Sequence, residues 1–301
     1  MVQAPTGTAK DTSDDVLDNL GPFARDLRAQ NRSEATIESY STAVRQFDAF
    51  LAEQGMPRLV ANIHREHVAA FIEGVLRRAK PATAANRYRS LQQFFRYLRD
   101  EGEITASPME RMKPPHVPEP LIPVLSEDEV KALLKATEGT TFDERRDRAI
   151  ISLMLDTGIR RAEVAGLRLE DLDRDQSVVF VVGKGSRPRS VPYDRKPARE
   201  LDRYIDRARK HHPHADEPWL WLGKKGRLTD SGITQVIRRR GIEAGIPALH
   251  PHQFRHTFAH QWLADGGQEG DLMQIAGWKE RSMPHRYGRS AAVPSQRALG
   301  G

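Results

Sequence analysis

The chain has 301 residues, of which 38% are hydrophobic and 29% charged, and its formal net charge is +6. That length allows two ordinary domains, and the basic balance fits a polyanionic partner such as DNA as well as an ordinary basic enzyme. The absence of cysteine excludes disulfides, thiolate zinc sites and cysteine nucleophiles. No run reaches the roughly 18 apolar residues of a membrane helix, and the N-terminus has no apolar signal segment, so we expect a cytoplasmic protein without a membrane span.

The first part of the chain has helical patterning. Residues 1–14 are small and polar, which predicts a disordered tail. Apolar residues then recur at helical spacing in four segments, which are 15–29, the stretch that follows Ser33, 65–79 and the stretch that Pro81 opens. Ser33 is a favourable N-cap, and proline is tolerated in a first helical turn. These patterns predict a helical domain of four helices over residues 15–112.

A proline-rich stretch follows this domain. Six prolines lie between Pro108 and Pro123, and proline blocks both helix and sheet. We therefore expect an extended, semi-rigid linker over residues 113–124.

A second domain is predicted over residues 125–301. It opens with a capping box formed by Ser126 and Glu129, and its nearly all-apolar segment 149–155 belongs in the centre of a domain. Two strand-like runs, 178–182 and 189–193, surround the loop GKGSRP and predict a β-hairpin. Further helices are expected at 194–210, 228–241, 251–263, 269–276 and 283–288. The fold class is therefore mainly α, with a small antiparallel sheet in the second domain.

The segment TGIRRAEV at 157–164 places an arginine and a glutamate three residues apart. Gly158 ends the preceding helix, so Arg160 and Glu163 would lie on one face of a short helix. A carboxylate can hold a guanidinium in position for two-pronged phosphate binding. The same spacing is typical of an ordinary surface ion pair, and the pattern alone leaves both interpretations open.

Lys184 lies at the tip of the predicted hairpin, between Gly183 and Gly185. The two glycines leave room for the loop to approach a ligand. A lysine at this tip can reach into a DNA groove, or it can be a solvated turn residue. The spacing of a phosphate-binding P-loop is absent.

The segment HPHQFRHTFAH at 250–260 is rich in histidine. His252 and Arg255 share a helix face and together offer a proton-transfer group and a second phosphate contact. His256 and His260 have the spacing of two zinc ligands on a helix, but a threonine follows His256 where the metalloprotease pattern requires glutamate. We therefore expect no metal site.

Tyr287 is the last residue with candidate chemistry. Positive charge surrounds it in the sequence, from Arg281, His285, Arg286 and Arg289. Such charge would ease loss of the phenolic proton, whose pKa is ordinarily about 10. Trp278 precedes Tyr287 by nine residues. Taken alone, either residue is equally well explained as part of a hydrophobic core.

The order of these residues resembles the catalytic signature of the tyrosine recombinases, the phage-integrase family. TGIRRAEV is similar to the family's TGLRxSEL, which puts Arg160 at the first arginine and Glu163 at its acidic partner. GKGSRPRSVP is similar to the stretch that carries the hairpin lysine, here Lys184.

The chain also resembles the second half of the family's signature. The box HxLRHTFA matches at His252 and Arg255, with phenylalanine replacing the usual leucine. Trp278 stands where most members have histidine, and Tyr287 stands at the position of the nucleophile. The resemblance indicates a simple two-domain member, Xer-like or Cre-like.

The resemblance implies a mechanism without a cofactor. Tyr287 would attack a DNA phosphodiester, form a 3′-phosphotyrosine and free a 5′-hydroxyl. Arg160 and Arg255 would stabilise the phosphate oxygens, and Lys184 would protonate the leaving oxygen. The proton acceptor would be His252, while Glu163 would orient neighbouring groups and Trp278 would pack the site.

The implied partner is double-stranded DNA, bound by a nucleoid-associated homotetramer on paired DNA sites. Two groups of arginines are candidate phosphate contacts, namely Arg87, Arg89, Arg96 and Arg99 in the first domain and Arg238, Arg239 and Arg240 in the second. Solvated helix faces would explain the same arginines.

Two other functions share this signature or fold. A type IB topoisomerase uses a similar tyrosine, but generally has lysine at the position of His252. A catalytically inert DNA-binding protein of the same fold would not need every catalytic position filled. A site-specific recombinase is therefore the predicted function.

Overall fold

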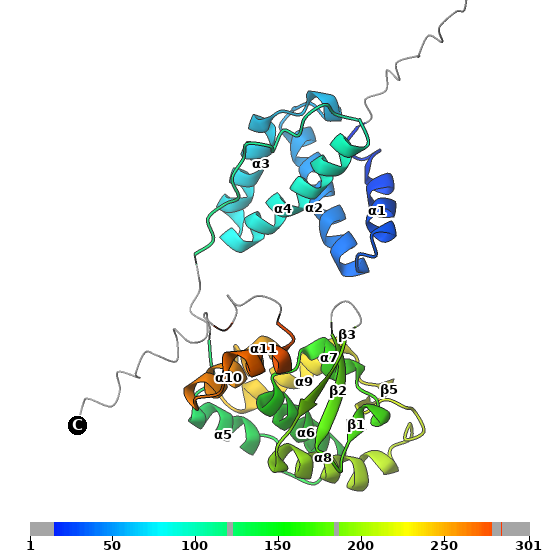
Figure 1. Ribbon diagram of the computed structural model, residues 1–301, viewed down its shortest axis with the longest axis vertical. Helices are drawn as coiled ribbons and strands as arrows, with labels where there is room; N and C mark the ends of the chain where they lie inside the picture. The colour runs from blue at the N-terminus through cyan, green and yellow to red at the C-terminus, as the bar shows by residue number, and fades with distance from the viewer. Residues whose placement is uncertain (1–14, 119–122, 184–186, 279–283, 285–301) are drawn as a thin grey trace, which may run out of the picture. The chain divides into compact units, whose positions relative to one another are not determined.

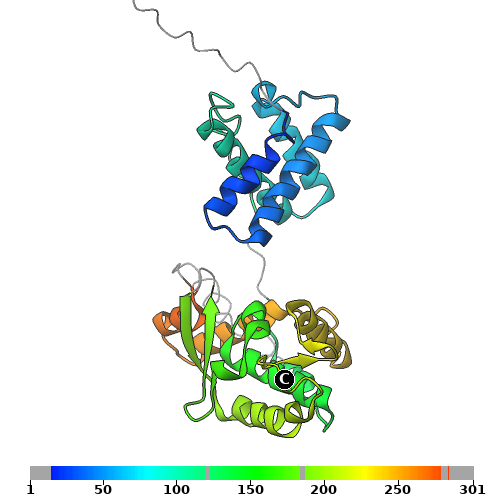
Figure 2. The same cartoon turned by 90° about the vertical axis from the view of Figure 1, so that its right-hand side faces the viewer.

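The computed structural model of the protein describes residues 15–118, 123–183, 187–278 and 284. The chain divides into two compact units, Met1–Pro120 and Leu121–Gly301. The first unit is helical, and the second combines helices with two small antiparallel sheets (Figures 1 and 2). None of the helices in the described residues combines the length and the apolar character needed to cross a bilayer.

The first unit contains the four predicted helices. They are α1 (Leu20–Ala29), α2 (Glu34–Glu53), α3 (Arg65–Arg78) and α4 (Pro81–Asp100), with a short 3-10 turn at Val60–Asn62. Ser33 caps α2 by accepting a hydrogen bond from the backbone N–H of Thr36, and Pro81 occupies the first turn of α4. The predicted helical fold of this part is confirmed.

Helix α1 begins later than predicted, at Leu20 instead of residue 15. Pro22 has no N–H to donate to residue 18, so a longer helix would lose a hydrogen bond and clash with proline. The preceding residues form turns instead. There Val16 is buried, and its N–H donates to the carbonyl of Arg58 at 3.1 Å.

Aromatic rings fill the core of the first unit. Phe47 packs edge-on against Phe71 and Phe95, with ring centroids 5.3 and 6.0 Å apart. Phe23 and Phe94 form another such pair, with centroids 5.4 Å apart. Each buried ring removes a large apolar area from water, and the edge-to-face geometry adds a favourable quadrupole term. The unit is thus held together mainly by apolar packing.

The chain beyond α4 continues to pack against the first unit. Ile104 and Met109 are buried in its core. The hydroxyl of Tyr88 in α4 donates to the carbonyl of Met112 at 2.7 Å. This anchors the segment up to residue 112 on the helices.

The second unit contains seven helices and five short strands in the described residues. The helices are α5 (Glu127–Lys135), α6 (Phe142–Thr157), α7 (Arg161–Gly166), α8 (Arg195–Arg207), α9 (Asp230–Glu243), α10 (Pro251–Ala264) and α11 (Glu269–Ala276), and short 3-10 turns lie at Leu169–Asp171 and Arg209–His211. The strands are β1 (Leu172–Asp173), β2 (Val178–Gly183), β3 (Arg187–Pro192), β4 (Leu222–Gly223) and β5 (Gly226–Arg227). The predicted capping box of Ser126 and Glu129 opens α5.

Helix α6 lies at the centre of the second unit, as its apolar sequence predicts. Ile150, Ile151, Leu153 and Met154 are all fully buried. The helix packs against both α8 and α10. Because side chains on several of its faces are covered, this helix carries the core around which the others assemble.

The predicted hairpin is confirmed in its two strands, which pair antiparallel with Val179 opposite Val191 and Val181 opposite Arg189. The three valines are buried and face the core. Strand β1 adds to the free edge of β2, and β4 and β5 form a second, smaller hairpin. These short strands were not predicted, because two residues cannot show a detectable alternation.

Helices α7 and α11 lie beside the β2–β3 hairpin at one edge of the second unit. Helix α7 packs beside β2, and α11 packs beside β3 and α10. Figures 1 and 2 show them near the end of the hairpin where β2 ends and β3 begins. This edge carries most of the described residues that the sequence singled out.

Candidate active site

The turn after α6 places the first predicted arginine. Gly158 ends α6 with left-handed backbone angles, at a φ of 58°. A Cβ at this position would lie 2.5 Å from a ring carbon of Phe258 in α10. Both the backbone angle and the close ring therefore favour glycine. The chain turns here and brings Arg160 to the start of α7.

Arg160 is the N-cap residue of α7, and Glu163 closes a capping box with it. The backbone N–H of Arg160 donates to Oε2 of Glu163 at 2.8 Å, and its Nη1 donates to Oε1 at 3.0 Å. The Glu163 side chain is only 5% exposed, whereas that of Arg160 is 37% exposed. This pair is not the exposed ion pair of a helix surface, since its carboxylate is buried and its guanidinium reaches the surface.

A second arginine, which the sequence analysis did not single out, binds the same carboxylate. Nη1 and Nη2 of Arg189 donate to Oε1 and Oε2 of Glu163 at 2.9 and 2.8 Å. Arg189 lies on β3, and its side chain is 12% exposed. The strand pattern could have revealed it, because Arg189 is two residues from Val191 and so faces the core with it.

The environment of Glu163 favours the ionised form. Burial by itself would raise the pKa of Glu163. The hydrogen bonds from Arg189 and from the backbone N–H of Arg160 outweigh burial and lower the pKa below its usual value. Glu163 is therefore a permanent negative charge at neutral pH.

Arg255 is the predicted arginine of α10, and it is 7% exposed. Its Nη1 donates to the carbonyl of Gly158 at 2.9 Å, and its Nη2 donates to the carbonyl of Ala276 at 2.6 Å. Arg255 thus joins the end of α6 to the end of α11. It brings a buried positive charge next to the turn that carries Arg160.

The end of α11 brings three arginines together. The successive carbonyls of residues 275–277 accept hydrogen bonds from Arg189, Arg255 and Arg160, in that order. Carbonyls at a helix C-terminus lack partners within the helix and form the negative end of its dipole. The helix end therefore holds the three guanidiniums in one small region.

Trp278 follows directly after this helix end. Gly277 takes left-handed angles with a φ of 62°, which ends α11 and turns the chain. The Trp278 ring is half-buried, and the guanidinium carbon of Arg255 lies 5.0 Å from the ring centroid. At that distance a cation–π interaction is favourable. The predicted Trp278 and Arg255 are therefore in contact.

His252 lies in the first turn of α10, where it is exposed, and its ring centroid is 6.3 Å from that of His250. Neighbouring protein atoms partly desolvate the imidazole, and this effect, followed by the positive potential of His250, Arg161 and Arg255, lowers the pKa of His252. The ring is consequently neutral at pH 7 and able to accept a proton.

The two histidines with zinc-ligand spacing show no sign of a metal centre. Burial, followed by repulsion from His252, His250 and Arg255, lowers the pKa of His256 to about 4. Within the described ranges, no group of three or more His, Asp or Glu side chains is arranged to hold a metal ion. His256 is thus a neutral, partly buried residue of α10.

Two predicted catalytic residues, Lys184 and Tyr287, lie outside the described residues. The same holds for the predicted helix at 283–288, apart from Pro284. Gly183, which precedes Lys184, is the last residue of β2, and Trp278 follows the C-cap of α11.

The candidate DNA contacts of α4 lie mostly at the surface. Arg89, Arg96 and Arg99 are exposed, and Arg87 is partly buried. Arg99 forms an ion pair with Asp100, in which its Nη2 lies 2.7 Å from Oδ1. All four remain predictions.

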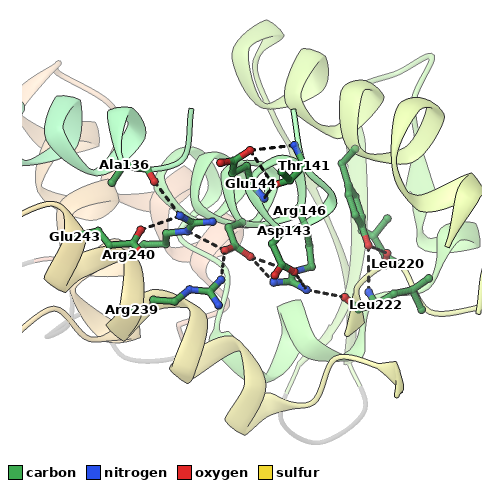
Figure 3. Close-up of polar contacts among 12 residues, drawn as sticks. Ala136, Thr141, Asp143, Glu144, Arg146, Leu220, Leu222, Arg239, Arg240 and Glu243 are labelled. Carbon is green, nitrogen blue, oxygen red and sulfur yellow. Dashed lines mark hydrogen bonds and ion pairs between the residues drawn. The ribbon is translucent and has the colours of Figure 1, made fainter. Parts of the chain in front are cut away.

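The three arginines of α9 differ from one another. Figure 3 shows Arg239 and Arg240 reaching toward α6, where both bind the fully buried Asp147. Arg240 also donates to Glu243 and to the carbonyl of Ala136, and it is 8% exposed. Its guanidinium is committed inside the protein, so the expectation that it contacts DNA is corrected. Arg238 and Arg239 are exposed and remain predictions.

The described part of the site can therefore supply two functions. Arg160 and Arg255 place two permanent positive charges at one helix end, which suits a phosphate whose negative charge grows during reaction. His252 supplies a neutral imidazole one helical turn before Arg255.

Comparisons with known proteins match both units of the chain. The sequence model of the phage integrase family matches residues 123–293, more than half of the chain, and that of the phage integrase N-terminal SAM-like domain matches residues 20–102. The tyrosine recombinase XerC of Myxococcus xanthus is 29% identical over 282 residues, covering 90% of this chain and 94% of the relative. XerC of Roseiflexus castenholzii is 31% identical over 271 residues, covering 88% and 86%.

Solved structures extend the comparison to the fold. The crystal structure of XerA recombinase shares 25% sequence identity and a TM-score of 0.51, covering 93% of this chain and 94% of that chain. A lambda integrase dimer bound to a core site gives a TM-score of 0.73 at 16% identity, covering 93% and 98%. Given the family match over both units, this chain belongs to the phage integrase family and is a tyrosine-type recombinase that cleaves and rejoins DNA at specific sites.

Proposed function

We propose that Tyr287 is the nucleophile of this recombinase and that Arg160 and Arg255 bind the phosphate it attacks. The observation that supports this most directly is the convergence of both arginines on the end of α11, ahead of Tyr287 in the chain. The phenolic oxygen bonds to phosphorus, and the bond from phosphorus to the 5′-oxygen breaks. The 3′-phosphotyrosine retains the energy of the phosphodiester, so rejoining needs no ATP.

The two arginines have distinct tasks in this proposal. Arg160 is partly exposed and uses two of its five N–H groups in the bonds to Glu163 and Gly277, so it can meet a non-bridging oxygen from solvent. Arg255 is buried and fixed by two carbonyls, so its charge acts from a set position. Fixed donors of this kind favour the transition state because they need no reorganisation.

Three further residues complete the proposal. His252, neutral at pH 7, accepts the tyrosine proton or donates to the phosphate. Lys184 protonates the departing 5′-oxygen. Trp278 packs against Arg255 and contributes an indole N–H, but no transferable proton.

The proposed substrate is double-stranded DNA, and the proposed active assembly is a homotetramer on paired sites. Support comes from lambda integrase, whose solved structures include a dimer on a core site and a tetramer on a Holliday junction. The exposed arginines of α4 and Arg238 and Arg239 of α9 would contact the phosphate backbone. Cytoplasmic, nucleoid-associated location follows as part of the same proposal.

The test is a search for the covalent intermediate. The full chain is incubated with genomic DNA, denatured, and collected with any DNA still attached. We expect the attached strand to resist a 3′ exonuclease, because its 3′ end is linked to the protein. The 5′-hydroxyl end released by cleavage should accept a phosphate from a polynucleotide kinase. Tyr287→Phe should abolish attachment while DNA affinity is unchanged. Tyr193→Phe is the matched control, since that hydroxyl donates to the carbonyl of Asp173 within the fold.

An adduct that persists in Tyr287→Phe would refute the assignment of the nucleophile. Sequencing of the attached DNA would give the target site. Relaxation of supercoils by single chains without any exchange of strands between sites would instead favour a topoisomerase-like activity.

A further inference from the structure

The buried carboxylate at the site has two arginine partners, and they bind it differently. Arg189 grips Glu163 with both Nη atoms, whereas Arg160 uses one Nη and its backbone N–H. The four hydrogen bonds fall two on each carboxylate oxygen. Two-pronged pairing is the stronger geometry, so Arg189 is the stronger of the two partners of Glu163.

This division determines the charge that a phosphate would meet. Glu163 cancels the charge of one arginine, so with Arg189 present the three side chains together keep one net positive charge. Without Arg189, the buried carboxylate would need another cation, because an unpaired charge away from water is costly. Arg160 is already hydrogen-bonded to it at 3.0 Å and could turn to form the two-pronged pair. A guanidinium held in that way would be neutralised and drawn away from the phosphate.

Arg189 also fixes the end of α11. Its Nε donates to the carbonyl of Ile275 at 2.8 Å. Gly277 lies against the guanidinium, since a Cβ on that glycine would be 3.3 Å from Cζ of Arg189. One side chain on β3 therefore holds both the acidic partner of Arg160 and the helix end to which Arg160 and Arg255 are bonded.

We propose that Arg189 is a positioning residue for DNA cleavage, which occupies Glu163 so that the guanidinium of Arg160 is left to bind the phosphate. This inference rests on the proposed role of Arg160. It adds a residue that acts through another and does not itself touch DNA.

The first test measures single-turnover cleavage, so that DNA binding does not mask the chemical step. Arg189→Met keeps an unbranched apolar stem and removes the charged guanidinium. We expect cleavage to slow on the order of 10²-fold, the size of effect that misplacement of a catalytic group produces. Arg174→Met is the matched control, because Arg174 also pairs with two carboxylates, Asp202 and Asp206 of α8, but follows β1 at the opposite edge of the sheet from β3. It should cleave at the wild-type rate.

The second test asks whether Glu163 causes the loss. If the freed carboxylate captures Arg160, then Glu163→Gln should restore cleavage in the Arg189→Met background, to near the rate of Glu163→Gln alone. A residue that only holds β3 to α11 would give no such rescue, and the double variant would be as slow as Arg189→Met or slower. Arg189→Lys keeps the charge but loses the fork, and it should fall between wild type and Arg189→Met.

The outcomes separate this inference from the proposed function. Wild-type cleavage by Arg189→Met, or a slow variant that Glu163→Gln does not rescue, would overturn the role of Arg189. Wild-type cleavage by Arg160→Ala would overturn the proposed function instead. Should Arg189→Met fail to fold in a thermal melt, Arg189→Lys with and without Glu163→Gln provides the same comparison.

Discussion

The two units of the molecule bury different kinds of side chains. Among the described residues of the first unit, Asp48 is the buried charged residue, and aromatic and aliphatic side chains fill the remaining core. The second unit buries a larger charged set, which consists of Arg146, Asp147, Glu163, Glu200, Arg209, Arg240 and Arg255. Both units are compact, so a unit of this kind can be held together mainly by apolar packing, with few buried charges.

The difference indicates what the buried charges contribute. Moving a charge out of water is costly, and a buried ion pair often stabilises a fold no better than apolar residues of the same volume. Such pairs do fix the geometry of the groups they join. In the second unit they join α6 to α9 through Asp147 and α7 to β3 through Glu163. Glu163 lies at the proposed site, so its charges are expected to matter for cleavage more than for folding.

The largest effect is expected at the site of the second unit, where His252 is the proposed proton acceptor. Replacing His252 with alanine should slow single-turnover cleavage by about 10²- to 10⁴-fold, the usual contribution of a general base. The neutral ring is the active form. Because burial and then neighbouring positive groups lower the pKa of His252 from its usual 6.5, the neutral form is still the major one at pH 6.5. The midpoint of the acid-side decline in cleavage should therefore lie below pH 6.5.

The cleavage rate measured as a function of pH checks whether the pKa of His252 is lowered. The decline on the acid side should disappear in the His252→Ala variant, whose residual rate no longer depends on that proton. A decline centred above pH 6.5, or one that the variant retains, would contradict the assignment. DNA affinity at each pH serves as the control, since protonation also adds positive charge.

The next prediction concerns the free energy of unfolding and compares one core variant from each unit. Asp147→Ala leaves Arg146, Arg239 and Arg240 without their shared partner, and breaking a buried pair typically costs about 3–5 kcal/mol. Phe95→Ala opens a cavity in the other core at a similar cost of about 3–5 kcal/mol. The two variants should therefore destabilise different units.

Tryptophan fluorescence can distinguish them, because all four tryptophans lie in the second unit, at positions 219, 221, 262 and 278. In urea, the fluorescence midpoint should fall for Asp147→Ala and stay in place for Phe95→Ala. Circular dichroism, which detects helices of both units, should show an early loss in each. Equal fluorescence shifts in the two variants would mean that the units unfold together.

The sequence predicted local features well and distant contacts poorly. Helix periodicity, the helix end at Gly158 and the capping box of Ser126 and Glu129 depend on neighbouring residues, and the structure confirms them. The Glu163–Arg189 pair joins residues on separate elements, and spacing along the chain contains no information about such a pair. The predicted Arg160–Glu163 contact exists, but it is the weaker half of a three-residue arrangement.

The expectation for Arg240 shows a limit of a different kind. Three consecutive arginines suggested one basic patch, yet successive residues on a helix point about 100° apart and cannot share a face. Arg240 is at helical spacing from the buried Ile233 and Ile237, which could have placed it inside. What periodicity could not supply is its partner, since Asp147 lies on another helix.

The smallest effect is expected where the first unit holds charge at its surface. Arg96 is exposed on α4, away from the aromatic core, so Arg96→Ala should leave the unfolding midpoint unchanged. If Arg96 contacts a phosphate, the variant should weaken DNA binding modestly and reduce the slope of log affinity against log salt by about 0.9. Arg99→Ala is the matched control one turn further along α4. The guanidinium of Arg99 is partly compensated by Asp100, so its removal should change the slope less.

An unchanged slope in Arg96→Ala would mean that this face of the first unit does not meet the DNA backbone. A changed slope together with a lowered midpoint would mean that the surface charge also supports the fold, and the contrast between the two units would then be weaker than their cores indicate.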